Sequence, residues 1–294
     1  MSLSNIPMAM QQMACAYCPD IESILFHKSE VTASTWLAGI ETGKSVEMLS
    51  LCGLVASLRR AGCQVTFPAI FQRNPDLFYI RNVIPRHHGA QAGHDIAIFN
   101  HISLADRFFG AMTPKAVVSR PDGKEFLVFR EGHPIHLINW VAAGNPEYLD
   151  RPDILIAQGS LLLHWEEDTV LYFSYEHAGG VCEGSLRLKN DINLPLISYK
   201  LTGEPIVPVN AILECSVGKG RITAEEQLSR YVGLFGKPEP PITVLINGKK
   251  KACPAYDLEI SINIGGGADS DLTNQLSSGL DVLARKICHS TTVT

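Results

Sequence analysis

The clearest pattern of apolar and polar positions in the chain is the run Val209–Ser216, VNAILECS. Its length and mostly apolar composition predict a buried β-strand, whose side chains alternate between two faces. Glu214 lies within this run, and a buried carboxylate needs a cation, a metal or several hydrogen-bond donors. The pattern leaves two interpretations open. Either Glu214 carries chemistry, or the strand is an edge strand and Glu214 faces water.

Apolar residues at helical spacing predict helices on either side of this strand in the sequence. The earlier helix follows Gly43-Lys44-Ser45 and ends at Gly62. Glu47 lies on its apolar stripe, although a negative charge near a helix N-terminus also has a purely structural explanation. The later helix begins at the capping box of Thr223 and Glu226 and ends before Gly236. A last helix is expected to end near Lys286.

Short strands and turns account for much of the remaining pattern. Pro121–Lys124 is expected to be the turn of one β-hairpin, and Glu166–Asp168 the turn of a second. Pro152 fixes the chain before another apolar strand and places Asp153 at the start of that strand. The run Ile242–Ile246 is almost wholly apolar, as is typical of a strand buried on both faces.

Length and composition favour one large globular domain. The chain has 294 residues, of which 46% are apolar and 19% charged. We expect a peripheral segment at 1–40 and an α/β domain over 41–294, with insertions at about 74–145 and 178–208. No apolar run is long enough to span a membrane, and the start of the sequence lacks the features of a secretion signal.

Charge and cysteine content narrow the function classes. A net charge of −5 argues against a protein that coats polyanions, but it leaves room for a local basic groove. The eight cysteines follow no regular framework, which predicts reduced thiols and a cytoplasmic protein. Cys15 and Cys18 have the spacing of zinc ligands, but no second close pair follows, so zinc is the minor alternative.

The order of these features resembles that of the PD-(D/E)XK nuclease superfamily, which has the restriction-endonuclease-like fold. Gly43–Glu47 is similar to the start of the family's first helix with its Glu, Pro152-Asp153 to its PD motif, and Glu214-Cys215-Ser216 to its E-x-K motif. The similarity is confined to short patches over 43–247. It implies a mixed central sheet flanked by helices. The gap of 61 residues between the Asp and the Glu (214 − 153) is long for this family and requires the insertion at 178–208.

The resemblance implies Mg²⁺- or Mn²⁺-dependent hydrolysis of DNA. Carboxylates suit hard cations, which activate water and stabilise charge on a phosphate. Asp153 and Glu214 would be the metal ligands, and Glu47 a third carboxylate that orients the metal-bound water. Asp95, in the sequence Gly93-His94-Asp95-Ile96, is similar to another form of the PD motif and is the alternative ligand.

The chain departs from the family at Ser216, where the motif has Lys. Lys219 lies three residues further on, and its flexible side chain could reach back into the site. Two other classes of function stay open. One is a degenerate, non-catalytic nuclease fold that binds nucleic acid or protein, and the other is an unrelated α/β protein in which the three carboxylates never meet.

DNA contacts are expected from basic residues near the site, because such residues grip backbone phosphates. The lysines could equally form a solvated turn, and the histidines do not match a common metal-ligand spacing. A homodimer would supply two active sites to a symmetric duplex. The candidate contacts are Arg86, His87, His88, Arg221, Lys249, Lys250 and Lys251.

Overall fold

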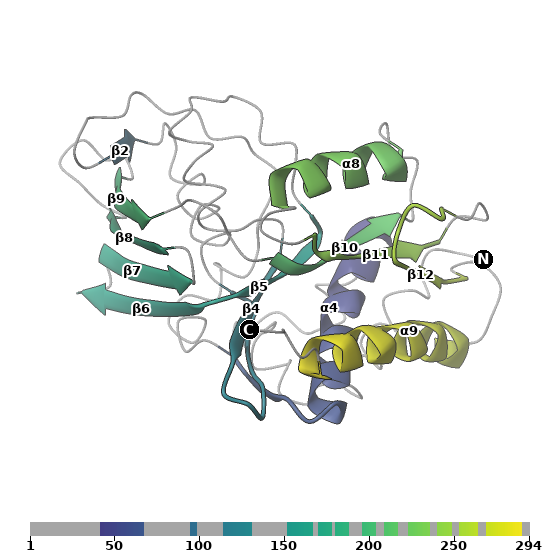
Figure 1. The fold of residues 1–294 in the computed structure, drawn as a ribbon. Helices are drawn as coiled ribbons and strands as arrows, with labels where there is room; N and C mark the ends of the chain where they lie inside the picture. Colours follow the sequence, from purple (N-terminus) through teal and green to yellow (C-terminus); the bar gives the residue numbers. More distant parts are fainter. Residues whose placement is uncertain are drawn as a thin grey trace, which may run out of the picture.

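A computed structural model describes residues 42–67, 95–98, 114–130, 152–166, 170–177, 180–187, 196–203, 209–216, 223–235, 240–248, 253–263 and 269–289. These residues form two β-sheets and three helices (Figure 1). Several sequence predictions fall outside them. These concern segment 1–40, Cys15 and Cys18, Lys219, and all the candidate DNA contacts: Arg86, His87, His88, Arg221, Lys249, Lys250 and Lys251.

A seven-stranded mixed sheet is the core of the described structure, in the order β1-β3-β4-β5-β10-β11-β12. Neighbours from β1 to β10 are antiparallel, whereas β10–β11 and β11–β12 are parallel. Its strands are β1 (Gln64–Thr66), β3 (Ala116–Ser119), β4 (Glu125–Arg130), β5 (Ile154–Gln158), β10 (Val209–Ser216), β11 (Ile242–Asn247) and β12 (Leu258–Ser261). The prediction of a mixed α/β fold with a central sheet is confirmed.

Strand β10 lies at the centre of this sheet, between β5 and β11. Leu213 pairs with Ile154 on one side and with Val244 on the other, and all three side chains are buried. The apolar run therefore forms a strand that is covered on both faces. The interpretation of Glu214 as a solvent-facing residue of an edge strand is wrong.

Helices cover both faces of the sheet (Figure 1). Helices α4 (Thr42–Arg60) and α9 (Asp269–His289) pack side by side on one face, and α8 (Ala224–Phe235) covers the other. A Cβ atom at Gly279 would lie 2.5 Å from Ile260 Cγ1, so the lack of a side chain lets α9 approach β12. None of the described helices combines the length and apolar character needed to cross a bilayer.

Helix α8 begins at the capping box that the sequence predicts. Thr223 Oγ1 accepts a hydrogen bond from the Glu226 backbone N–H at 3.2 Å, and Glu226 Oε2 accepts one from the Thr223 N–H at 2.8 Å. These bonds satisfy two donors near the start of the helix. They fix the first turn of the helix that carries Gln227 and Tyr231, which reach Glu214.

Removing this cap should destabilise the protein modestly. Thr223→Ala is expected to lower the free energy of unfolding by about 1 kcal/mol, as is usual for loss of an N-cap side chain. Urea denaturation at neutral pH measures the change, with Ser229→Ala, at an exposed position of the same helix, as the matched control. Equal stabilities of the two variants would contradict the assignment of the cap.

A second sheet of five antiparallel strands has the order β2-β9-β8-β7-β6. The chain passes into it from β5 at Gly159, whose φ of 148° favours glycine and where a Cβ would lie 2.6 Å from the Glu176 carbonyl oxygen. Its strands are β2 (Asp95–Ile98), β6 (Ser160–Glu166), β7 (Val170–His177), β8 (Gly180–Arg187) and β9 (Leu196–Gly203).

The strands of the two expected insertions are divided between the two sheets. The strand-rich segment predicted at 178–208 contributes β8 and β9 to the five-stranded sheet, together with the predicted hairpin of β6 and β7. The region 74–145, in contrast, includes the hairpin β3–β4, which belongs to the central sheet. Its strands are too short for the sequence alone to show which sheet they join.

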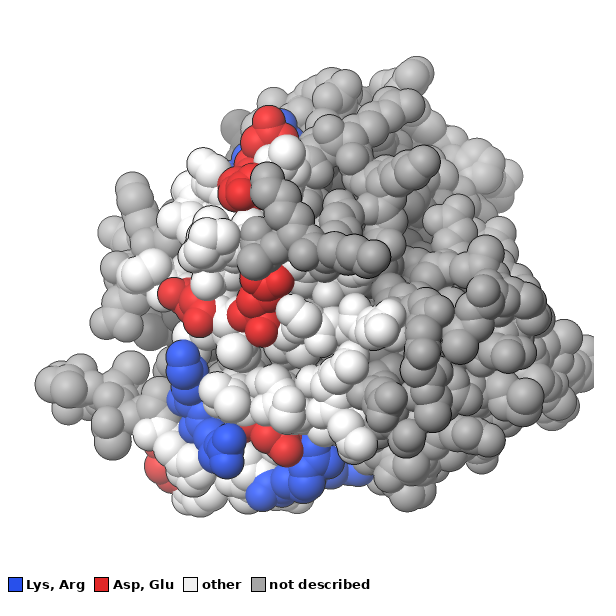
Figure 2. Space-filling model, turned by 90° about the vertical axis from the view of Figure 1, so that its right-hand side faces the viewer, with Lys and Arg blue, Asp and Glu red and all other residues white. Residues whose placement is uncertain are grey.

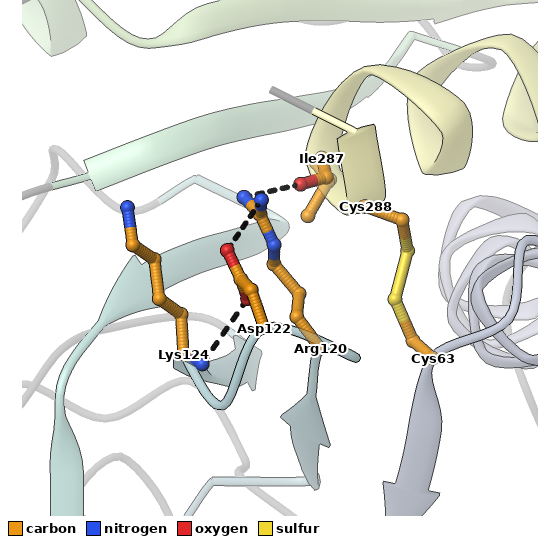
Figure 3. The surroundings of a disulfide bond; sticks show 6 residues. All are labelled: Cys63, Arg120, Asp122, Lys124, Ile287 and Cys288. Carbon is orange, nitrogen blue, oxygen red and sulfur yellow. Dashed lines mark hydrogen bonds and ion pairs between the residues drawn. A yellow bond between two sulfur atoms is a disulfide. The ribbon is translucent and has the colours of Figure 1, made fainter. Parts of the chain in front are cut away.

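Cys63, the residue before β1, forms a disulfide with Cys288 near the end of α9 (Figure 3). The prediction of reduced thiols is wrong for this pair, because packing brings together residues separated by 225 positions. Next to it, Arg120 Nη1 donates to the Ile287 carbonyl oxygen at 3.1 Å, and the Arg120 guanidinium pairs with Asp122 at 2.8 Å (Figure 3). The end of α9 is thus tied to both β1 and the β3–β4 hairpin.

Candidate active site

The candidate residues gather at one end of the central strands. Because β5 and β10 are antiparallel, the pairing of Ile154 with Leu213 places the start of β5 beside the end of β10. Asp153 immediately precedes Ile154, and Glu214 immediately follows Leu213. The register alone therefore brings to the same sheet end two residues that are 61 positions apart in the sequence (214 − 153).

Glu214 is buried, with only 6% of its surface exposed. Gln227 Nε2 donates to Oε1 at 2.9 Å, and the Tyr231 hydroxyl donates to Oε2 at 3.1 Å, both from α8. Burial chiefly, together with the charge of Glu47, nevertheless raises the pKa of Glu214 to about 7. The donors satisfy both oxygens without supplying the positive charge that an ionised buried carboxylate needs.

Asp153 is fixed by the neighbouring strand. Its Oδ2 accepts a hydrogen bond from the Cys215 backbone N–H at 2.7 Å. In return, a backbone hydrogen bond from Asp153 to the Glu214 carboxylate opposes the rise in the pKa of Glu214. The two acidic residues therefore occupy adjoining positions, each held in part by the backbone next to the other.

Glu47 does not have the role that the resemblance implies. It lies on the buried face of α4, with 2% of its surface exposed, and its Oε1 accepts a hydrogen bond from Arg130 Nε. Arg130 ends β4 and is 5% exposed. Glu47 is thus one half of a buried ion pair, in place of the third carboxylate expected to orient metal-bound water. The sequence could not show this pairing because the partners are 83 residues apart.

The thiol of Cys215 lies within the electrostatic influence of three acidic residues. Burial raises its pKa well above the ordinary thiol value, and the charges of Asp153, Glu47 and Glu214 raise it further. Its Sγ lies 3.8 Å from the Ser50 hydroxyl of α4. Three carboxylates that are distant in sequence therefore act electrostatically on one thiol. The interpretation in which the three carboxylates do not form one site stays an alternative, because Glu47 is paired with Arg130.

Ser216 occupies the position where the family motif has Lys. It ends β10, where it pairs with Asn247 of β11, and its carbonyl oxygen accepts a hydrogen bond from the Gly248 N–H at 3.1 Å. Lys219 is outside the described residues. The motif position therefore brings no positive charge to this end of β10.

Two buried basic residues that the sequence motifs missed lie near each other, at the ends of β3 and β4. One is Arg130, and the other is Lys115, which immediately precedes β3 and is 1% exposed. Burial lowers the pKa of Lys115 well below its usual value, and the charge of Arg130 lowers it further. A signal was present in the sequence, because each residue adjoins an apolar strand of the predicted hairpin and the antiparallel pairing brings those two strand ends together.

The metal prediction rests on the carboxylate pair alone. Among the described residues, no group of three or more His, Cys, Asp or Glu side chains has the arrangement of a metal site. Asp153 and Glu214 still fit Mg²⁺ chemically, because this ion commonly binds one or two carboxylates and takes its other ligands from water and substrate phosphate. Bound next to Glu214, a cation would also favour the ionised form that burial disfavours.

Asp95 has a different location from the other candidate ligands. It begins β2 and pairs with Tyr199 of β9, within the five-stranded sheet. Strand pairing places Glu214 in the seven-stranded sheet instead. The backbone arrangement therefore favours Asp153 over Asp95 as the partner of Glu214.

The described surface shows both signs of charge. Figure 2 shows acidic side chains prevailing in the upper part of one face and basic side chains in its lower part. At one exposed point, Arg60 pairs with Asp281 at 2.7 Å. A large surface of purely basic character is absent from the described part of this face.

Comparisons with known proteins return no relative. No protein-family model matches the chain, and neither curated proteins nor solved structures contain a match.

Proposed function

We propose that the protein is a metal-dependent endonuclease that hydrolyses phosphodiester bonds of DNA, with Asp153 and Glu214 as metal ligands. One observation carries the proposal: Glu214, buried beside Asp153 and within the electrostatic field of Glu47, has a pKa near 7. Structural carboxylates in a core normally have an ion-pair partner or donors that keep them ionised. A buried carboxylate whose pKa stays raised although three donors reach it is typical of a functional site.

The topology supports the finer assignment to a restriction-endonuclease-like fold. A helix with a buried Glu is followed by antiparallel strands, then by a strand with Asp at its start and an antiparallel partner with Glu near its end. Helix α8 then links β10 to the parallel strand β11. This is the order of features that the resemblance implies. A homodimer is proposed with it, since a symmetric duplex offers two equivalent bonds.

The protein's own residues prepare the site before any ligand binds. Gln227 and Tyr231 fix the two oxygens of Glu214, and the Cys215 N–H fixes Asp153. Burial raises the pKa of Tyr231, so its hydroxyl stays protonated and remains a donor. When bound, Mg²⁺ would lower the pKa of a water molecule and stabilise charge on the phosphate.

Plasmid cleavage tests this proposal. Supercoiled DNA should be nicked or linearised in Mg²⁺ or Mn²⁺, and a chelator should stop the reaction. Asp153→Asn is expected to lower the rate about 100-fold, because it removes a charged ligand while preserving shape. Asp281→Asn is the control, since Asp281 lies in an exposed ion pair with Arg60. Cleavage by Asp153→Asn at the wild-type rate would end the proposal.

Ser216 favours one alternative, a nuclease-like fold that binds nucleic acid without cutting it. The described end of β10 has no lysine at the motif position. This function predicts no cleavage with any divalent metal, together with DNA binding that weakens as salt increases. The plasmid assay and a salt titration of binding therefore separate the two functions.

A further inference from the structure

Tyr256 lies between the central sheet and helix α8, in a turn that precedes β12. It is 6% exposed, and its ring belongs to a buried cluster with Leu228 of α8 and Leu245 of β11. Leu245 pairs with Glu214 across β11 and β10. The ring therefore packs beside the strand position that carries the buried carboxylate, under the helix whose side chains reach that carboxylate.

The hydroxyl of Tyr256 binds the first turn of α8. It donates a hydrogen bond to the Ala224 carbonyl oxygen at 2.9 Å. Ala224 and Gln227 are three positions apart, so they lie on the same side of the helix. Gln227 is the residue of this turn that donates to Glu214. The capping box joins α8 only to itself, whereas the bond from Tyr256 ties this turn to another part of the fold.

The turn that carries Tyr256 is itself attached to two strands of the sheet. Asp257 Oδ2 accepts hydrogen bonds from the Thr243 backbone N–H and from Thr243 Oγ1, both at 2.8 Å. The Cys253 N–H donates to Glu259 Oε2 at 2.9 Å. Thr243 belongs to β11 and Glu259 to β12. Tyr256 therefore extends from a fixed support, which lets its hydroxyl set the place of the helix.

The phenol also lies within the electrostatic influence of the two proposed metal ligands. Burial chiefly, and then the charge of Glu214, raises the pKa of Tyr256, and the charge of Asp153 adds to this effect. The hydroxyl consequently stays protonated and remains a donor to Ala224 at any pH at which the protein is folded and working.

We propose that Tyr256 is a positioning residue for the metal site: through its bond to Ala224 it holds the first turn of α8 and thereby aligns Gln227 with Glu214. The inference rests on the proposed function and deepens it by naming a residue that acts on a metal ligand through the helix. Groups that orient a metal ligand influence both metal affinity and activity without touching the metal.

The test compares wild type with Tyr256→Phe, which removes the hydroxyl and keeps the packed ring. Tyr172→Phe is the matched control, because the Tyr172 hydroxyl also donates at 2.9 Å, to Glu166 at an exposed position of the second sheet. Calorimetry measures Mn²⁺ affinity, and plasmid cleavage in Mg²⁺ gives kcat and KM. Isotope-edited NMR follows hydrogen exchange of the Gln227 side-chain amide without metal or DNA.

Tyr256→Phe is expected to bind Mn²⁺ about tenfold more weakly and to have a kcat about tenfold lower, as is usual when a group that orients a metal ligand is lost. KM for DNA should stay within about twofold of wild type, because the hydroxyl does not touch the substrate. The Gln227 amide should exchange about tenfold faster, since its bond to Glu214 is formed less often. Tyr172→Phe should match wild type in every measurement.

A double-mutant cycle with Gln227→Met tests the route through the helix. Met keeps the length of Gln but has no donor for Glu214. If Tyr256 acts through Gln227, adding Tyr256→Phe to Gln227→Met should weaken Mn²⁺ binding by no more than about twofold. A further tenfold loss in the double variant would overturn this route.

The outcomes separate this inference from the proposed function. If wild type cuts DNA while Tyr256→Phe keeps the wild-type Mn²⁺ affinity, kcat and Gln227 exchange, the role of Tyr256 is overturned and the nuclease proposal stands. If wild type neither binds Mn²⁺ nor cuts DNA, the nuclease proposal fails. Faster Gln227 exchange in Tyr256→Phe then still supports the alignment of Gln227 with Glu214 by Tyr256, and unchanged exchange overturns it.

Discussion

Glu214→Gln is expected to stabilise the folded protein above pH 7 and to abolish DNA cleavage. The pKa of Glu214 rises from 4.5 to about 7 on folding, chiefly because the group is buried. Below pH 4.5, Glu214 is protonated in both the folded and the unfolded state, and its contribution to the free energy of unfolding is fully present. That contribution is lost as the pH rises through 7, because the unfolded state releases the proton at a lower pH than the folded state does.

The size of this effect follows from the pKa difference. The rise from 4.5 to about 7 corresponds to about 3 kcal/mol at pH 8, an upper estimate because Glu214 and its neighbours titrate together. Gln keeps the shape of Glu without the charge, so the variant escapes this penalty. It also loses the charge that a divalent metal needs, so its stability gain and its loss of function have one cause.

Urea denaturation of both proteins at pH 5 and pH 8 measures this prediction. The difference in free energy of unfolding between variant and wild type should be small at pH 5 and should approach 3 kcal/mol at pH 8. Mn²⁺ should raise the Tm of wild type but not of the variant. Glu125→Gln, at an exposed position on β4, is the control. A difference that does not change with pH would contradict the proposed state of Glu214.

The local parts of the fold were predictable from the sequence because they depend on short-range patterns. The apolar run at β10 identifies a buried strand, and the reciprocal bonds of Thr223 and Glu226 follow from residue types at fixed spacing. The two hairpins follow from turn residues between apolar segments. The convergence of Asp153 and Glu214 required one further step, the order of motifs in a resembling family.

The remaining features depend on contacts between distant segments. Nothing near Glu47 in the sequence indicates that Arg130 would occupy its carboxylate, because that contact depends on α4 packing over the end of β4. The partition of strands between two sheets depends on the turn at Gly159, which a sequence pattern does not distinguish from a simple hairpin turn. Ion pairs and sheet membership are thus properties of the assembled core, whereas helix caps and strand faces are local.

Reducing the Cys63–Cys288 disulfide should destabilise the protein more than any of the point changes above. The bond closes a chain separation of 225 residues, for which loop-closure entropy gives about 5 kcal/mol. Both cysteines are buried, and the bond joins the start of β1 to the helix that packs beside α4. In the reduced protein, the end of α9 keeps only non-covalent contacts, such as the bond from Arg120 to the Ile287 carbonyl oxygen.

A phosphine reductant and Cys288→Ala provide independent measurements of this effect. Each should lower the free energy of unfolding of the wild-type protein, and the reductant should have no further effect on Cys288→Ala. Cys253→Ala removes a buried cysteine that forms no disulfide, so this control should stay sensitive to the reductant. If the reductant leaves the urea midpoint of wild type unchanged while mass spectrometry shows both thiols free, the bridge does not constrain the fold. The packing of α9 against α4 and β12 would then be sufficient to hold the C-terminal helix.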